Sequence, residues 1–264
     1  MHWLATLPLI VGANSIASSM CSANCSNTPK IVAPASILVS GLLVSIEAVG
    51  GKEVRYTTDG SDPTYDSALY KGQIWVTASM TLKAASFDRN NRVGEVAAQT
   101  FTKVVPTRGS HMSMLSSGLD CEEFHGLWRT VPNFDSMQPD ISFVTSAFGP
   151  PQKNGVVEKQ VGQLYEGFVN VKTEDVYLFS LTSRDGAKLW IDGRLTIDDD
   201  GLHRRKTKKG AEALGVGAHR IKLAWFHADG PAALSLEWAP VDGKMAPFGI
   251  RDISHMRRMP KGAP

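Results

Sequence analysis

The sequence predicts an all-β protein. Short runs in which apolar and polar residues alternate recur from residue 31 to about residue 240, and Asp-Gly and Gly-Gly pairs separate them. No segment keeps a helical period over the roughly 10–12 residues that a helix needs. Hydrophobic residues make up 42% of the chain, which is enough to form hydrophobic cores. Its length of 264 residues leaves room for two domains. We therefore expect two β units, the first of them a sandwich.

The first block predicts one sandwich of about the size of an immunoglobulin domain. Its expected strands are 42–48, 54–57, 80–87 and 97–101. Turn-forming residues lie between them at Gly50-Gly51, at 59–63 and at 88–91. Short strands that are interrupted every 8–12 residues or so are typical of a sandwich.

Residues 1–28 are predicted to be a secretory signal segment. No Asp, Glu, Lys or Arg precedes Lys30, and a predominantly apolar run at 4–16 is followed by small residues. That run is too short to remain as a helix across a bilayer, and no other segment qualifies. We therefore expect a secreted or cell-surface protein without a membrane span.

Two segments are predicted to lie outside the folded units. Residues 105–117 contain Pro106, Gly109 and several Ser without apolar alternation, which indicates a linker between two separately folding units. We expect a protease to cut there, near Arg108. Residues 251–264 form a basic tail.

The second block has strands with clear inward and outward faces. We expect strands at 167–171, 176–181, 189–191, 219–226 and 234–238. Alternation predicts a core built from Ile221, Leu223, Trp225, Leu234, Leu236 and Trp238, joined by Phe168 and Phe179. Trp128 and Trp190 stay open between a place in the core and an exposed ring that stacks on a sugar.

Charge and cysteine content exclude several classes. The net charge is only +2, and the basic run 204–209 directly follows an acidic triplet, so we expect a solvated loop and no nucleic-acid partner. Of the three cysteines, Cys121 lies in an apparent strand and is expected to be a buried small side chain. No spacing indicates a zinc site.

The most informative stretch is 183–193 together with 198–203, where five Asp and three Gly surround one short strand. Carboxylates on tight loops suit a calcium or sugar site, and they are also ordinary turn formers. No motif of a nucleophilic, zinc-dependent or phosphate-binding enzyme occurs, so we expect no catalytic residues and no enzyme activity. His203 and His219 are expected to serve structural hydrogen bonds.

Residues 30–104 resemble a known accessory module. The string Tyr-Thr-Thr-Asp-Gly-Ser-Asp-Pro-Thr at 56–64, then Tyr70 and the strand 81–87, is similar to the chitobiase/hexosaminidase carboxy-terminal module. The resemblance implies a fibronectin-like β sandwich of the kind attached to secreted glycoside hydrolases and surface proteins.

Residues 118–250 resemble the anthrax protective-antigen-type (PA-fourteen) domain. The matching motifs are Pro-Asn-Phe-Asp at 132–135, Asp-Gly-Ala-Lys-Leu-Trp-Ile-Asp-Gly at 185–193 and Asp-Asp-Gly-Leu-His at 199–203. The resemblance implies a β barrel or sandwich that recognises carbohydrate in some members and serves assembly in others. In its sugar-binding adhesins, two adjacent Asp hold a calcium ion. The matching positions are Arg184 and Asp185, and the Arg removes one anionic ligand and adds a repelling charge.

Together the two resemblances imply a secreted, non-catalytic carbohydrate-binding or adhesion protein whose partner is a glycan or glycoprotein. The alternatives are an accessory fragment of a hexosaminidase- or fucosidase-type hydrolase, with that enzyme as partner, or a structural module of cell-surface assembly. The resemblance implies calcium as a cofactor, with Asp185 as a metal ligand. The positive charge of Arg184 argues against calcium binding at this position. The predicted carbohydrate-binding residues are Asp185, Trp190, Asp199, Asp200 and His203.

Overall fold

The computed structural model describes residues 27–150, 152–153, 156–157 and 159–256, and it confirms the all-β fold. These residues form strands, turns and the short 3₁₀ turn η2 (Phe134–Ser136), without an α-helix. No helix in this part of the chain has the length and apolar character to span a membrane. Almost all of the predicted signal segment, and most of the basic tail, lie outside the described residues.

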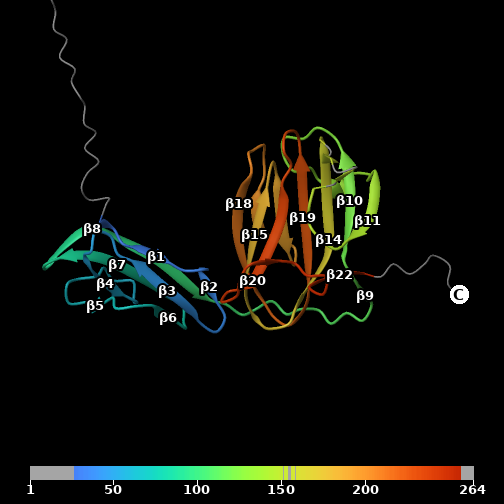
Figure 1. Ribbon diagram of the computed structural model, residues 1–264. Coiled ribbons are helices and arrows are strands. Elements are labelled where there is room, and N and C mark those ends of the chain that lie inside the picture. Colours follow the sequence, from blue (N-terminus) through green and yellow to red (C-terminus); the bar gives the residue numbers. More distant parts are fainter. Residues whose placement is uncertain (1–26, 151, 154–155, 158, 257–264) are drawn as a thin grey trace, which may run out of the picture.

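The amino-terminal unit packs two sheets face to face (Figure 1). One sheet has the strand order β1 (Lys30–Val32), β3 (Leu42–Glu47), β6 (Ile74–Val76). The other has the order β2 (Ile37–Leu38), β8 (Asn91–Lys103), β7 (Met80–Asp88), β4 (Glu53–Thr57), β5 (Ala68–Leu69). Alternate residues of these strands point inward and form the core, which contains Leu42, Val44, Val54, Val76, Leu82 and Phe101.

The carboxy-terminal unit is a larger sandwich. Its eight-stranded sheet runs β11 (Ile141–Thr145), β10 (Leu119–His125), β14 (Val161–Val171), β19 (Gly217–His227), β16 (Ala187–Ile191), β17 (Arg194–Asp199). Off this path, β22 (Ile253–Met256) pairs with β14, and β9 (Leu115–Ser117) pairs with β22. The facing sheet runs β18 (Lys206–Leu214), β15 (Asp175–Ser183), β20 (Leu234–Pro240), β21 (Ala246–Pro247). β12 (Gln152–Lys153) and β13 (Val156–Val157) pair antiparallel with each other.

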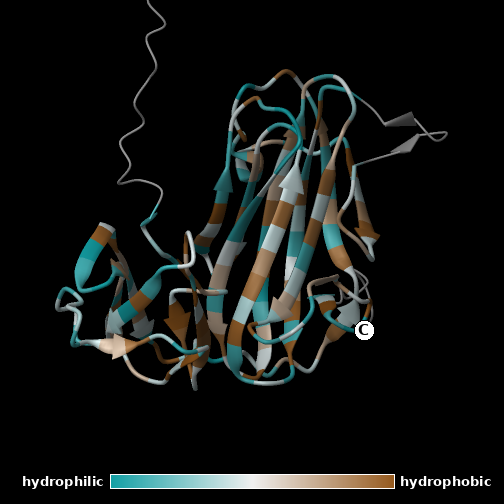
Figure 2. Cartoon of the chain, turned by 60° about the vertical axis from the view of Figure 1, so that its left-hand side comes forward, coloured by the Kyte–Doolittle hydropathy of each residue, from teal (hydrophilic) through white to brown (hydrophobic). Residues whose placement is uncertain are grey.

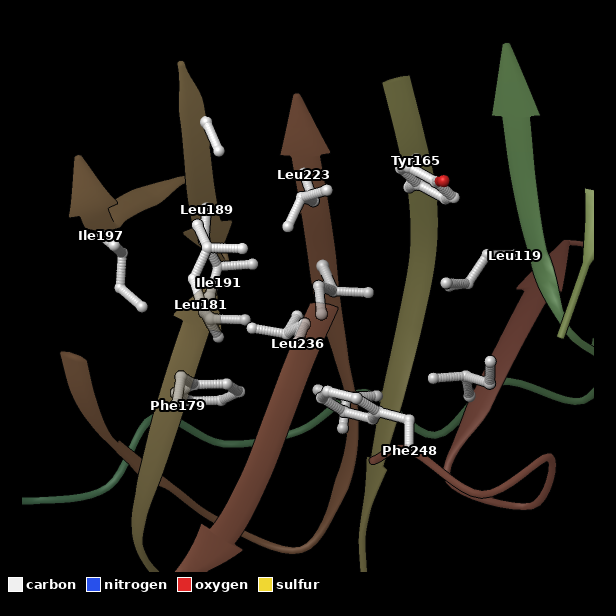
Figure 3. Close-up of a cluster of buried hydrophobic side chains, with 14 of the residues drawn as sticks. Leu119, Tyr165, Phe179, Leu181, Leu189, Ile191, Ile197, Leu223, Leu236 and Phe248 are labelled. Carbon is white, nitrogen blue, oxygen red and sulfur yellow. The ribbon is translucent and has the colours of Figure 1, made fainter. Parts of the chain in front are cut away.

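The core of this unit lies between the two sheets. Figure 3 shows Leu189, Leu223 and Tyr165 of the large sheet facing Phe179 and Leu236 of the smaller one. On β16, the buried Ala187, Leu189 and Ile191 alternate with the less buried Lys188 and Trp190. Figure 2 shows hydrophobic and hydrophilic residues interspersed along the strands of this unit. Full burial of each such side chain contributes about 1.5–3 kcal/mol, so this layer holds the sandwich together.

The cysteine prediction is confirmed, since Cys121 is buried in this core. Burial, with the nearby Glu123 carboxylate, raises the pKa of its thiol to about 12. The thiolate is therefore essentially absent at neutral pH, and the residue behaves as a small apolar side chain.

Phe168 is buried, as predicted, but it lies outside the cluster between the two sheets. The inward positions of β14 are Tyr165, Val169 and Val171, and Phe168 points to the outer face of the sheet. A one-residue difference in phase moves a side chain to the opposite face, and both phases of β14 carry apolar residues. Trp238 is partly buried against the core.

The basic run at 204–209 is for the most part not a loop. Residues 206–209 begin strand β18, whose whole length pairs with β15. Side chains also join the two strands, since the hydroxyls of Thr207 and Thr182 lie 2.7 Å apart. Lysines suit this position because β18 ends its sheet, where charged side chains oppose pairing with another chain.

The segment predicted as a linker lies against the carboxy-terminal unit, along its lower edge in Figure 1. The Thr107 amide donates to the Ala213 carbonyl (3.0 Å), and the Ser110 amide donates to the Ala218 carbonyl (2.8 Å). Nearby, Leu38 shares an apolar cluster with Val176 and Ala213 of the other unit. Backbone pairing and apolar packing thus join the two units.

Candidate functional site

Strand β16 lies between two aspartates in the left-handed backbone region, Asp185 (φ 62°) and Asp192 (φ 49°). Asp tolerates this region better than most residues, and each is followed by Gly. These turns bring both carboxylates beside the ends of the neighbouring strand β19. The Asp-Gly pairs of the sequence therefore set where each carboxylate lies, and the contacts below determine what each can do.

The carboxylate of Asp185 points into the protein. The side chain is buried, and its Oδ2 accepts the Ala228 amide hydrogen (3.0 Å) and lies 3.1 Å from Nδ1 of His227. The other ring nitrogen of His227 lies 3.1 Å from the Gly230 carbonyl oxygen. We call this arrangement the first Asp–His clasp. Because it occupies Oδ2, the carboxylate is not a free ligand on an open loop.

Asp192 forms a second Asp–His clasp at the other end of β16. Its Oδ2 lies 2.8 Å from Nδ1 of His219, and its Oδ1 accepts the Arg220 amide hydrogen (2.9 Å). Nε2 of His219 lies 2.8 Å from the Gly215 carbonyl oxygen. Burial alone would lower the pKa of His219, but these two acceptors raise it overall. Both ring nitrogens face oxygen acceptors, so the geometry suits an imidazolium.

Arg184, which stands where the resemblance implies a second calcium ligand, is bound to a neighbouring loop. Its Nε donates to the Asp229 carbonyl (3.0 Å), and its guanidinium covers Gly230, where an added Cβ would lie 2.5 Å from Nη2. Within the described residues, no group of three or more His, Cys, Asp or Glu is arranged to hold a metal ion. The loop carries a fixed cation beside the single carboxylate of Asp185.

Asp199 is fully buried, and its carboxylate contacts groups of the protein. Its carboxylate accepts the Ser183 hydroxyl (3.1 Å) and pairs with the ammonium group of Lys206 (2.9 Å). His203 completes the cluster, with Nε2 at 3.0 Å from the Asp199 carbonyl oxygen and Nδ1 at 2.9 Å from that of Arg204. These contacts give Asp199 and His203 structural roles.

Asp200 links the acidic segment to the outer face of the large sheet. It forms an ion pair with Lys188 of β16 (2.8 Å) and accepts the amide hydrogens of Val131 (2.6 Å) and Gly201 (2.7 Å). Burial alone would raise the pKa of Asp200, but these partners lower it below its ordinary value. Asp200 therefore anchors the segment around Val131 onto the sheet.

That outer face holds a groove of about 730 Å³. Its floor consists of outward side chains of β10, β14, β19 and β16, and one wall is the segment 131–135. The polar and aromatic residues that line it are Asp120, Asn133, Phe134, Asp135, Glu166, Phe168, Lys188, Trp190, Arg220 and Lys222.

Trp190 is a half-buried aromatic side chain in this groove. Its inner part packs against a small apolar cluster that contains Phe134 and Leu164. Directly across the strand pair lies Lys222, whose ammonium is 5.9 Å from the indole centroid. Lys222 also pairs with both carboxylate oxygens of Asp135 (2.6 Å each). The groove thus combines an anchored indole with hydrogen-bonding groups on one side.

The structure separates the residues that the sequence grouped into one site. Trp190 lines the groove and Asp200 reaches its rim through Lys188. Asp185 and Asp199 are buried instead, and the partly buried His203 contacts the carbonyl oxygens of Asp199 and Arg204. Sequence reasoning missed Lys222 and Glu166. Both could have been found, because they alternate with inward residues on their strands. The contact of Asp135 with Lys222 could not, because the two residues lie 87 positions apart in the sequence.

Comparison with known families identifies two regions. Residues 125–247 match the PA14 domain, and residues 44–101 match a family described as Fn3 associated. No curated protein matches the chain at a significant level.

Among solved structures, the chain is similar to the PA14 domain of the MpAFP antifreeze protein (17% identity, 58% of this chain, 98% of that chain, TM-score 0.47). It is also similar to a PA14 sugar-binding domain from an RTX adhesin (16%, 53%, 98%, TM-score 0.46). A third similar structure is the Epithelial Adhesin 9 A domain of Candida glabrata in complex with Galb1-4GlcNAc (10%, 58%, 95%, TM-score 0.44).

Proposed function

Because residues 125–247 form a PA14 domain, we propose that this chain is a non-catalytic carbohydrate-binding or adhesion protein, secreted or held at the cell surface. Its glycan lies in the groove on the outer face of the large sheet. The observation that carries the proposal is the half-buried indole of Trp190 in that groove.

The groove has the size and chemistry that a sugar needs. A volume of about 730 Å³ lies within the ordinary range for small-molecule sites. The indole offers an apolar surface to the C–H face of a pyranose ring. Beside it, the Lys222–Asp135 pair and Glu166 offer donors and acceptors to sugar hydroxyls.

We propose that binding does not require calcium. The carboxylate of Asp185 already accepts the Ala228 amide hydrogen and contacts His227. A calcium ion there would also meet the cationic Arg184, whose side chain is held by the Asp229 carbonyl. A tight site would need several further oxygen ligands.

The absence of catalysis is likewise part of the proposal. Asp185 and Asp192, the two carboxylates that flank β16, are each held by a backbone amide and a histidine. A glycoside hydrolase needs one carboxylic acid able to give up a proton beside the scissile bond. The chitobiase-type identity of residues 30–104, and with it the alternative of an accessory module for a hydrolase, stays a prediction. Turnover of chromogenic hexosaminides or fucosides by the purified chain would contradict the proposal.

A glycan array, probed with the purified chain in calcium and in EDTA, tests the proposal. We expect binding that is equal in both conditions and that falls at least tenfold in Trp190→Ala. Phe143→Ala is the matched control, because Phe143 is an exposed aromatic residue of the same sheet outside the groove. Loss of binding in EDTA, or full binding by Trp190→Ala, would refute the groove as the metal-independent site.

A further inference from the structure

The outer face of the amino-terminal sheet β1-β3-β6 carries an exposed indole beside polar and charged side chains. Inward residues of these strands fill the core, so Leu43, Ser45 and Trp75 project from the opposite face. Leu43 lies directly across from Trp75, and Ser45 lies across from Val32. We propose that this face is a second carbohydrate-binding surface, which takes a short neutral oligosaccharide. It shares the ligand class of the proposed function but not its site.

Trp75 is exposed and nevertheless held in position. About half of the residue is accessible (53%), and Leu43 beside it is 40% accessible. The indole rests against the backbone at Gly41, where an added Cβ would lie 2.6 Å from Cε2 of the ring. Gly41 therefore leaves the space that the ring occupies. An aromatic ring positioned before the ligand arrives loses less conformational freedom on binding.

Polar groups continue the face away from the indole. The Gln73 amide donates to the Ser45 hydroxyl (3.4 Å), and beyond them Lys30 pairs with Glu47 (3.5 Å). The three groups lie beside residues 43, 45 and 47 of β3, which span about 13 Å along the strand. The order is aromatic, then neutral polar, then a charge pair of zero net charge. That order fits a sugar stacked on Trp75 whose neighbouring residue is hydrogen-bonded by Gln73 and Ser45.

The size of the patch favours a glycan over a protein partner. Its exposed large apolar side chains are Leu43 and Trp75, whereas a stable protein interface buries about 800 Å² on each partner, with 20–30 residues a side. A pyranose ring needs one aromatic surface and a few hydrogen-bonding groups. The near-cancelling charges of Lys30 and Glu47 give no preference for an acidic polysaccharide.

Fluorine NMR on the 5-fluorotryptophan-labelled chain tests the proposal directly. The probes are a panel of neutral oligosaccharides: cello-, manno-, xylo- and chitohexaose. The Trp75 resonance is assigned by its absence in Trp75→Ala. We expect one of these sugars to shift that resonance, and we expect the shift to persist in Trp190→Ala, in which the groove is impaired. Affinity for that sugar in the Trp190→Ala background should fall at least tenfold when Trp75 is also replaced.

Glycine variants separate positioning from simple loss of the ring. Gly41→Ala should displace the indole and weaken binding while the Trp is retained. Gly72→Ala should bind normally, because its added Cβ meets no atom within 4 Å. If no sugar moves the Trp75 resonance while Trp190→Ala still abolishes glycan binding, this inference fails and the proposed function stands. If the sugars shift Trp75 and the groove variants have no effect, the opposite holds.

Discussion

Replacing Asp199 by Asn should destabilise the carboxy-terminal unit without touching a ligand. Asp199 is fully buried, and the variant loses a charged acceptor for the Ser183 hydroxyl together with its ion pairs to Lys206 and Lys208. The hydrogen bond to a charged group is worth about 1.5–3 kcal/mol. The lysine side chains are 42% and 49% exposed, so each ion pair adds at most about 1 kcal/mol, and each ammonium can return to water. We expect a loss of about 2–3 kcal/mol.

Urea unfolding measures this loss. With an m-value of about 2 kcal/mol/M, the midpoint should fall by about 1–1.5 M. Asp198→Asn is the matched control, because Asp198 is an exposed neighbour whose carboxylate accepts the nearby Asp200 amide hydrogen. Glycan affinity should be unchanged in folded Asp199→Asn. An unchanged midpoint combined with lost glycan binding would refute the structural role and return Asp199 to the binding site.

The pKa of His219 is raised, so its stabilising contact with Asp192 is complete below the unfolded value of 6.5 and is lost as pH rises through the folded pKa. Unfolding between pH 6 and pH 9 should therefore show a loss of stability in the wild type that His219→Gln lacks; parallel curves would contradict this. Arg184→Asp should create or strengthen calcium binding by calorimetry, whereas tight binding by the wild type would show that other oxygens complete a site. Leu38→Ala should cost about 2–4 kcal/mol and accelerate tryptic cleavage at Arg108, because it loosens the packing between the units. Equal cleavage rates would refute that coupling.

The buried face could be predicted from the sequence where apolar side chains are separated by a polar residue. Leu234 and Leu236 flank a polar Ser235, Ile221 and Leu223 flank a charged Lys222, and the structure buries all four apolar side chains as expected. Where both phases are apolar, as around Phe168, alternation cannot choose the inward face. The prediction of a loop at the lysines of β18 was wrong for another reason. Their strand forms by pairing with β15, whose residues lie about 25 positions away in the sequence.

The direction of the acidic side chains could not be predicted. An Asp-Gly turn fixes where Asp185 sits on the backbone, but its carboxylate is oriented by His227 and Ala228, more than 40 positions away. The same holds for Asp199 and the residues around it. A turn motif therefore predicted the presence of carboxylates at this end of the sheet, and long-range hydrogen bonds decided that they face inward.

The bound segment around Thr107 and Ser110 also bears on avidity. A flexible tether would let two sugar-binding surfaces explore many separations, and the second binding event would have a broad, modest effective concentration. Here backbone hydrogen bonds and the Leu38 cluster fix the separation between the Trp75 face and the Trp190 groove. Avidity then increases for polysaccharides that are stiff enough and long enough to occupy both surfaces at that distance. A polysaccharide that cannot span the distance binds one surface at a time and shows no avidity.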